Sequence, residues 1–550
     1  MRRAAVIACA CVVSALATHA QQKPVLADLK TTAESSGYKS TSTYDEVVTF
    51  MKTVDEASPL IFYTTYGTTT EGRAMPMAVV GAGLKDASPA SVKGSGKLRV
   101  HIQGNVHAGE VEGKEAALVL LRELAMGQHK DWLQSMVFLV TPDYNADGNE
   151  KFALTNRQRQ NGPINGMGTR ANAQNLNINR DYMKLDTPEA KAFVTLWNDY
   201  DPHVGFDLHT SDGSYHGYYL TYSPPLNPDT DPAIMKVMTD EWFPAVTKEM
   251  KAKHGWNSFY YGNVSTPGGR GAGGGRGRGG TPAPPCQMQQ PDPAVTRAWA
   301  TFDHVPRFHN NYVGLRNRFA LLSEAYAYAT FEDRIKATSY FIEEALNFAH
   351  QNAARLKQAI VDADRARIVG VMEATSAKLK RGGMVEVLMG EVETVKNPRN
   401  DADMCNRKDV VKPEQMVDMM WFEPVATETA PSAYYVPADA TKAIELLKAH
   451  GVQMKGVSQP VKGVEQFTIA NNTAGPAAFE GHTMRRLEGQ WQAAPDVAVP
   501  VGAWEVPLTQ PLARLAFYLL EPASDDGLVN WNFLDDQLKD AKVYPILRKK

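Results

Sequence analysis

The sequence predicts an α/β fold with a mixed, largely parallel central sheet flanked by helices and an appended C-terminal module rich in β-strands. Short apolar runs typical of strands alternate with amphipathic helical patterns over residues 41–350, as in a parallel sheet covered by helices. From about residue 368 the pattern changes to short strands and turns. Metal-capable side chains also stand where two of the apolar runs end, which is where open α/β sheets form their sites.

The elements of the first part follow from local patterns. Thr43 precedes a helical pattern with acids directly after it, as a capping threonine does. The apolar residues of 112–126 recur at helical spacing, whereas 136–140 is an apolar run of the buried-strand type. In order, we expect helix 43–54, strands 60–66, 75–80 and 97–104, helix 112–126, strand 136–140, helix 190–197, strands 203–208 and 319–322, and helix 331–362.

Composition indicates a soluble globular protein with more than one domain. The chain has 550 residues, of which 43% are hydrophobic and 22% charged. A formal net charge of −3 argues against nucleic acid or a strongly acidic molecule as a partner. We expect no transmembrane segment, because no apolar run is long enough to span a bilayer.

Residues 1–20 indicate an export signal. Two arginines, Arg2 and Arg3, precede an apolar stretch, Ala4–Ala17, and a cleavage site after Ala20. The sequence therefore predicts an exported protein, periplasmic or extracellular.

Residues 264–295 interrupt the α/β pattern with a run rich in Gly, Arg and Pro that cannot bury a core. RGG-like runs can contact nucleic acid, but in an exported chain of near-neutral charge we expect a flexible surface loop. Cys286 in this insert and Cys405 either form one disulfide or remain thiols. The module 368–550 contains one helical pattern, Ala440–His450, which Asp439 could cap.

Two histidines and a glutamate are candidate metal ligands. His107 and Glu110 stand on the turn that leaves strand 97–104, and His209 follows strand 203–208. The His-x-x-Glu spacing alone is weak, because with 13 histidines and 61 acids it arises by chance on the order of once. Its place at a strand end, with a second strand-end histidine elsewhere, indicates a His₂Glu catalytic zinc site with one position open for water.

Three other histidines compete for the third ligand position. His203 begins its strand, at the wrong end of the sheet, and His101 lies inside a strand. His216 remains an alternative. His209 itself could be a strand-end histidine held by hydrogen bonds, and only the His-x-x-Glu pattern favours the ligand role.

Seven short segments occur in an order and at separations that are specific when taken together. They are Glu71-Gly72-Arg73, His107-Ala108-Gly109-Glu110, Asn145-Ala146-Asp147-Gly148, Arg157-Gln158-Arg159-Gln160-Asn161, Asn177-Ile178-Asn179-Arg180, Leu208-His209-Thr210 and Leu322-Ser323-Glu324. In these segments the chain resembles the zinc carboxypeptidases of metallopeptidase family M14, which have the carboxypeptidase A fold, over about residues 41–350.

The resemblance implies catalytic roles. Glu324 would be the general base that takes a proton from zinc-activated water and passes it to the leaving amine; its alternative is a buried strand-end glutamate. Arg159 would stabilise the oxyanion of the tetrahedral intermediate, with Arg157 as its competitor. The alternative for both arginines is a solvated place on a loop.

The resemblance also implies how a peptide substrate is held. Asn179 and Arg180 would bind its terminal carboxylate, because a planar bidentate donor suits a planar acceptor. The alternative for Arg180 is an ion pair with Asp181. Tyr312 would be the family's substrate-capping tyrosine.

Three departures from the family pattern bear on these roles. Gly109 stands between the first two ligands, where the digestive enzymes carry an arginine. Asn177 stands where those enzymes have an aspartate that orients a zinc-bound histidine; asparagine accepts the same hydrogen bond without a charge, so the tuning would be weaker. The insert at 264–295 lies where a specificity-bearing segment is expected.

These observations together predict an exported zinc metallocarboxypeptidase, with one zinc ion per chain, that removes C-terminal residues from peptides with a free carboxylate. One alternative is a zinc amidase or deacylase on the same scaffold, acting on peptidoglycan stem peptides or amino-acid conjugates. The other is a non-catalytic binding protein on a peptidase fold.

Overall fold

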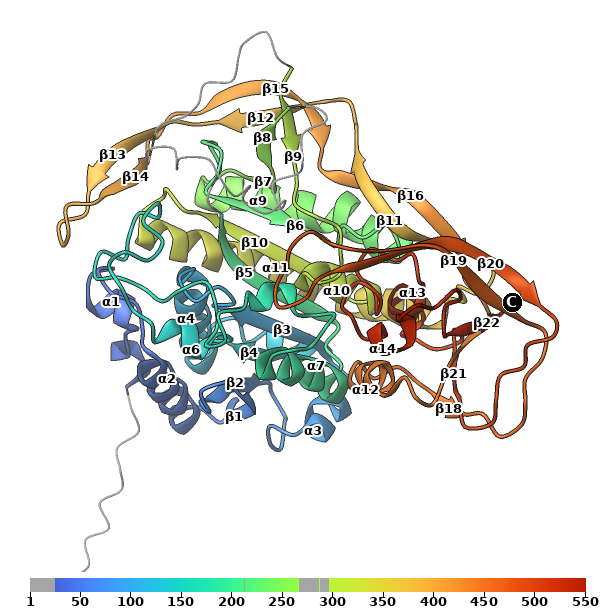
Figure 1. Ribbon diagram of the computed structural model, residues 1–550. Helices are drawn as coiled ribbons and strands as arrows, with labels where there is room; N and C mark the ends of the chain where they lie inside the picture. The colour runs from blue at the N-terminus through green and yellow to red at the C-terminus, as the bar shows by residue number, and fades with distance from the viewer. Residues whose placement is uncertain (1–24, 212, 267–285, 287–295) are drawn as a thin grey trace, which may run out of the picture.

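The computed structural model describes residues 25–211, 213–266, 286 and 296–550 (Figure 1). The predicted export signal, residues 1–20, lies outside these ranges. Among the helices that are described, none is both long and apolar enough to cross a membrane.

An eight-stranded mixed sheet forms the centre of the molecule. Its strands are β1 (Ile61–Thr68), β2 (Ala74–Val80), β3 (Leu98–Gly104), β4 (Met136–Thr141), β5 (Val204–Ser211), β6 (Leu220–Ser223), β7 (Ser258–Tyr260) and β10 (Phe319–Tyr326). They lie in the order β1-β2-β4-β3-β5-β10-β6-β7. The β4–β3, β3–β5, β5–β10 and β6–β7 pairs are parallel and the remaining three are antiparallel. The predicted mixed, largely parallel sheet is therefore confirmed.

Helices cover both faces of this sheet. Alternate residues of a strand point to opposite sides, so apolar residues in succession present an apolar surface on each face. Met77 and Val79 of β2 pack into one hydrophobic cluster, and Ala78 and Val80 pack into the other. The first cluster includes α7 (Pro188–Tyr200) and α10 (His309–Leu315), and the second α2 (Tyr44–Ala57), α4 (Glu112–Ala125), α9 (Phe243–His254) and α11 (Phe331–Arg365). Shorter helices are α1 (Thr32–Ser35), α3 (Pro89–Gly94), α5 (Trp132–Ser135), α6 (Ala146–Asn149) and α8 (Pro232–Val237).

Side-chain caps determine where several helices begin. Thr43 and Glu46 form a capping box at the start of α2, as the sequence predicted. Thr187 caps α7 by accepting the Ala190 N–H. The predicted cap of α12 (Thr441–Ala449) by Asp439 is wrong, because the residue at the cap position is the following alanine, which makes no side-chain cap hydrogen bond.

Residues 368–550 are rich in strands, as predicted. The strands are β11 (Met372–Lys380), β12 (Met384–Met389), β13 (Val392–Lys396), β14 (Asp403–Arg407), β15 (Lys412–Met419), β16 (Trp421–Thr429), β17 (Ala433–Val436), β18 (Lys455–Gly456), β19 (Val464–Ala474), β20 (Arg485–Ala494), β21 (Trp504–Pro507) and β22 (Leu547–Lys549). Two further helices, α13 (Ala513–Leu520) and α14 (Asp535–Leu538), accompany α12.

The insert is tied to these C-terminal strands. The strands that flank it, β8 (Asn263–Ser265) and β9 (Ala298–Ala300), join β15 and β12 in a four-stranded sheet. Cys286 forms a disulfide with Cys405 on β14. The pairing that the sequence left open is therefore present.

The C-terminal strands also share a hydrophobic core with the central sheet. One cluster contains Phe193 of α7 and Tyr312 of α10 together with Tyr434 of β17 and Phe517 of α13. The domain boundary near residue 368 remains a prediction, and this cluster lies on both sides of it.

Candidate metal centre and substrate pocket

Strand register brings the candidate residues to one edge of the sheet. The strand β3 ends at Gly104 beside β5, and Glu324 on β10 lies opposite His209 on β5. The turn that follows β3 carries His107 and Glu110. Because β3, β5 and β10 are parallel, their carboxyl ends meet at this edge.

The three predicted ligands converge there. His107 Nδ1 lies 3.0 Å from Glu110 Oε1, and His209 Nδ1 lies 2.8 Å from Glu110 Oε2. One donor atom from each residue lies within 4.8 Å of the other two, and all three side chains are buried. Two imidazoles and one carboxylate form the donor set of a catalytic zinc site.

The second nitrogen of each imidazole is held by another side chain. His107 Nε2 lies 3.0 Å from Asn177 Oδ1, and His209 Nε2 lies 2.9 Å from Asp207 Oδ2. Both Nε2–H groups therefore donate, which leaves the Nδ1 lone pairs for a metal ion. The residues present thus fit zinc.

Asp207 was not among the residues selected from the sequence. It stands two residues before His209 on β5, so both side chains lie on the same face of that strand. A carboxylate two residues before a strand-end histidine is the signal by which it could have been found.

Burial and charge act differently on the two histidines. Burial lowers the pKa of His107 to about 3, and the neighbouring Arg170 adds to the effect. Burial also disfavours the charged form of His209, but Asp207 and Glu110 outweigh it and raise its pKa well above the usual value. Burial would raise the pKa of Glu110, yet His107, Arg157 and His209 hold it well below its usual range, so this carboxylate stays ionised as a ligand must.

Gly109 makes room for Arg157. A Cβ added at Gly109 would lie 2.6 Å from Arg157 Cγ. Arg157 fills that space and places Nη2 2.5 Å from Glu110 Oε1. A guanidinium is therefore present beside the turn that carries His107 and Glu110. It comes from the loop that carries Arg157 and not from the turn itself.

The competing histidines lie elsewhere. His101 Nε2 is 2.9 Å from Thr141 Oγ1, and His203 Nδ1 accepts the Arg99 N–H. The buried ring of His216 packs on Tyr326.

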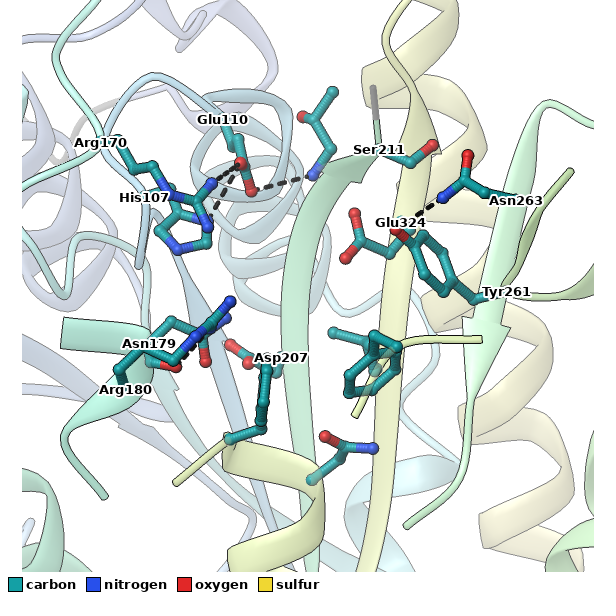
Figure 2. Close-up of a pocket in the computed structure, with 15 residues that line it drawn as sticks. His107, Glu110, Arg170, Asn179, Arg180, Asp207, Ser211, Tyr261, Asn263 and Glu324 are labelled. Atoms are coloured by element: carbon teal, nitrogen blue, oxygen red, sulfur yellow. Dashed lines mark hydrogen bonds and ion pairs between the residues drawn. The ribbon is translucent and has the colours of Figure 1, made fainter. Parts of the chain in front are cut away.

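A cavity of about 170 Å³ opens beside the ligands (Figure 2). Glu324 stands across it from His107 and Glu110, and Asn179 and Arg180 lie on the side of His107. The structure thus places the predicted base and the predicted carboxylate-binding pair at one cavity. Its other lining residues are Arg170, Asp207, Thr210, Ser211, Tyr261, Asn263, Phe302, Phe308, Asn310 and Leu322.

The guanidinium of Arg180 is held by two neighbours at the cavity. Its guanidinium lies 3.9 Å above the Phe308 ring and donates to the Asn179 carbonyl. Burial and the nearby Arg170 lower its pKa to about 9. The alternative ion pair with Asp181 does not form, because Asp181 lies 2.9 Å from the amino group of Lys184 instead.

Two predicted residues are not brought to the cavity. Arg159 is exposed and is not among the residues that line the cavity. Tyr312 is fully buried on α10 with its hydroxyl 2.9 Å from His450 Nδ1. Their expected roles do not fit these positions, because one side chain lies on the surface and the other lies in the core.

A different arginine, Arg170, lies at the cavity. It lines the cavity, and its Nη1 lies 3.5 Å from Glu110 Oε1. The loop that carries Arg170, between Asn161 and Asn177, contains no helix or strand. The sequence therefore offers no periodic pattern from which the orientation of its arginines could be predicted.

Comparison with known proteins agrees with this geometry. Residues 47–256 match the zinc carboxypeptidase model of peptidase family M14. Carboxypeptidase 2 of Trichophyton rubrum is 24% identical over 505 residues, covering 87% of this chain and 81% of the relative. A protein named Probable carboxypeptidase 2 from Arthroderma benhamiae is 33% identical over 143 residues, 25% of this chain and 23% of the relative. A solved metallo-carboxypeptidase from Burkholderia cenocepacia aligns with a TM-score of 0.38 and 17% identity, covering 56% of this chain and 70% of that one.

The family match includes the turn with His107 and Glu110, the Asn177–Arg180 segment, and His209. These segments carry the three converging side chains and two residues of the cavity wall, Asn179 and Arg180. Over residues 47–256 the chain is therefore similar to the zinc carboxypeptidases of metallopeptidase family M14.

Proposed function

We propose that this chain is an exported zinc carboxypeptidase that hydrolyses the last peptide bond of substrates with a free C-terminal carboxylate. The observation that carries the proposal is a single cavity beside a three-ligand set, lined by both Glu324 and Arg180. Export is supported by the pattern of residues 1–20 and by the Cys286–Cys405 disulfide, which fits an oxidising compartment.

One zinc ion held by His107, Glu110 and His209 would polarise the scissile carbonyl and lower the pKa of an attacking water. Glu324 lies across the cavity, where it can take the proton of that water and return it to the leaving amine. Arg170 can stabilise the negative charge that develops on the carbonyl oxygen, because its guanidinium stands beside the ligands at the cavity wall.

The substrate carboxylate would bind Arg180 and Asn179. Among the described residues, no ion pair joins Arg180 to a carboxylate. The charges of Glu480 and Asp303 act on Arg180, but a half-buried guanidinium with no ion-pair partner still favours an anionic ligand. The proposed site therefore selects the end of a peptide rather than its middle.

The free carboxylate separates this function from an amidase on the same scaffold. We expect release of an amino acid from an N-blocked dipeptide, and at least about tenfold slower release from its C-terminal amide, because the amide cannot pair with Arg180. Comparable rates on the amide or on a muropeptide would favour the amidase or deacylase instead.

Replacement of the proposed base tests whether the chain is an enzyme. We expect Glu324→Gln to lower kcat by about 10²–10⁴ while zinc content stays the same as in the unchanged protein. Steady-state kinetics on the blocked dipeptide, with metal analysis of both proteins, measure this. Unchanged turnover would contradict the proposed mechanism.

A further inference from the structure

A tight turn from the C-terminal strands reaches the substrate site. Phe479 and His482 exchange two backbone hydrogen bonds, of 2.8 and 3.0 Å, across Glu480 and Gly481. These two central residues have φ values of +46° and +86°, as in a two-residue type I′ turn. Because few residues with a Cβ adopt a positive φ, a glutamate at this position points to a function for its side chain.

This 479–482 turn contacts both ends of the segment 177–186, which carries the proposed carboxylate-binding pair. At one end, Glu480 Oε2 accepts the Asn177 N–H at 2.8 Å. At the other end, His482 Nε2 lies 2.9 Å from Asp186 Oδ2. The segment is therefore held from outside the central sheet by residues about 300 positions further along the chain.

Asn177 connects the turn to the metal ligand and to the anion site. Its Oδ1 lies 3.0 Å from His107 Nε2 and accepts the Asn179 N–H at 3.1 Å. Glu480 holds the backbone of the same residue. Glu480 therefore fixes the position from which the Asn177 side-chain amide orients His107 and Asn179.

One side of the turn packs against the C-terminal part of the chain, although Phe479 itself is 36% exposed. The ring of Phe479 stacks on Trp531, and the Arg307 guanidinium lies 5.5 and 4.9 Å from these two ring centroids. Arg307 also pairs with the buried Asp526 at 2.9 Å. These contacts join the turn to the C-terminal core, so the turn can act as a fixed support for the segment.

We propose that Glu480 is a positioning residue, through which the C-terminal part of the chain completes the carboxylate-binding site by clamping residues 177–186. This inference rests on the proposed carboxypeptidase function, because Asn179 and Arg180 serve catalysis only when the substrate ends in a carboxylate. It gives the C-terminal strands a direct part in substrate binding.

Three variants test the clamp. Glu480→Ala removes the acceptor, whereas Glu480→Gln keeps a side-chain oxygen. Glu488→Ala is the matched control, because Glu488 lies on the same hairpin, where it accepts a hydrogen bond from Asn471. We expect Glu480→Ala to raise KM for the blocked dipeptide about tenfold with kcat changed by less than about threefold, as for the loss of one hydrogen bond. Glu480→Gln and Glu488→Ala should stay within about twofold of the unchanged protein in KM.

Hydrogen exchange gives a second readout that does not need activity. Faster exchange of the amides of residues 177–186 in Glu480→Ala, and not in Glu488→Ala, is the expected result. An unchanged KM and unchanged exchange in Glu480→Ala, or equal losses in Glu480→Ala and Glu480→Gln, would overturn the inference. An unchanged protein that releases no amino acid would overturn the proposed function instead, and the exchange data would still decide whether Glu480 clamps the segment.

Discussion

At the scale of single residues, two arginines approach the same carboxylate oxygen of Glu110. Arg157 Nη2 lies 2.5 Å from Oε1 and fills the space beside Gly109. Arg170 Nη1 lies 3.5 Å from the same oxygen and lines the substrate cavity. Electrostatic stabilisation depends on where charge develops in the transition state, so we propose Arg170, which lines the cavity, as the arginine that acts on the substrate.

Replacing Arg170 and Arg159 in turn tests which of them stabilises the oxyanion. We expect Arg170→Ala to lower kcat/KM by about 10²–10³, the usual loss when one donor to an oxyanion is removed. Arg159→Ala should change kcat/KM by less than about twofold, because the side chain is exposed away from the cavity. Kinetics on the blocked dipeptide measure both. A large loss in Arg159→Ala alone would restore the assignment made from the sequence.

The convergence of three donor side chains could be predicted from the sequence because position and chemistry agree. His107, Glu110 and His209 follow apolar strands and are the right donor types for zinc. Tyr312 could not be placed in the same way. Its aromatic ring suits either a binding pocket or a core, and packing on α10 decides for the core.

At the scale of elements, the register of parallel strands assembles the site. Leu208 pairs with Gly104 and His209 with Glu324, so β5 brings the other two strand ends together. Strands of this kind were predictable from their apolar runs. The 479–482 turn was not, because its glutamate meets Asn177 across a sequence separation of 303 residues and no local pattern encodes that contact.

The contact between His482 and Asp186 should make stability depend on pH. The hydrogen bond to Asp186 raises the pKa of His482, and Lys184 acts in the opposite direction. Burial would raise the pKa of Asp186, but His482 and Lys184 lower it. A raised histidine pKa stabilises the fold fully below the unfolded pKa of about 6.5, and that stabilisation is lost as pH rises through the folded pKa.

Comparison with His482→Gln isolates this effect. We expect the stability advantage of the unchanged protein over the variant to be greater at pH 5.5 than at pH 9. This advantage, measured as the difference in free energy of unfolding, should be about 0.5–1 kcal/mol larger at the lower pH, the range for a partly exposed ion pair. Denaturant unfolding at the two pH values measures the difference. A difference between the two proteins that is equal at both pH values would contradict the assignment.

At the scale of the whole molecule, one hydrophobic cluster extends from the central sheet into the C-terminal strands. The change of sequence pattern near residue 368 suggests a domain boundary there. It does not show which surfaces of the two parts pack against each other. The shared cluster and the 479–482 turn both argue that residues 368–550 support the catalytic part.

Truncation tests that dependence. A chain ending at residue 366 would expose the face that packs against Tyr434 and Phe517. We expect its midpoint of thermal unfolding to fall by more than about 10 °C, because the lost apolar burial stabilises the fold by several kcal/mol. Calorimetry of both chains measures this, and an equal midpoint would show that the two parts fold independently.

The most direct measurement is a zinc titration of the metal-stripped protein, followed by amino-acid release from the blocked dipeptide. The account predicts that activity is lost on chelation and returns to a plateau at one zinc ion per chain, and that His209→Ala shows no such return. Full activity after the metal is removed, or a plateau at a different stoichiometry, would contradict a single catalytic zinc held by His107, Glu110 and His209.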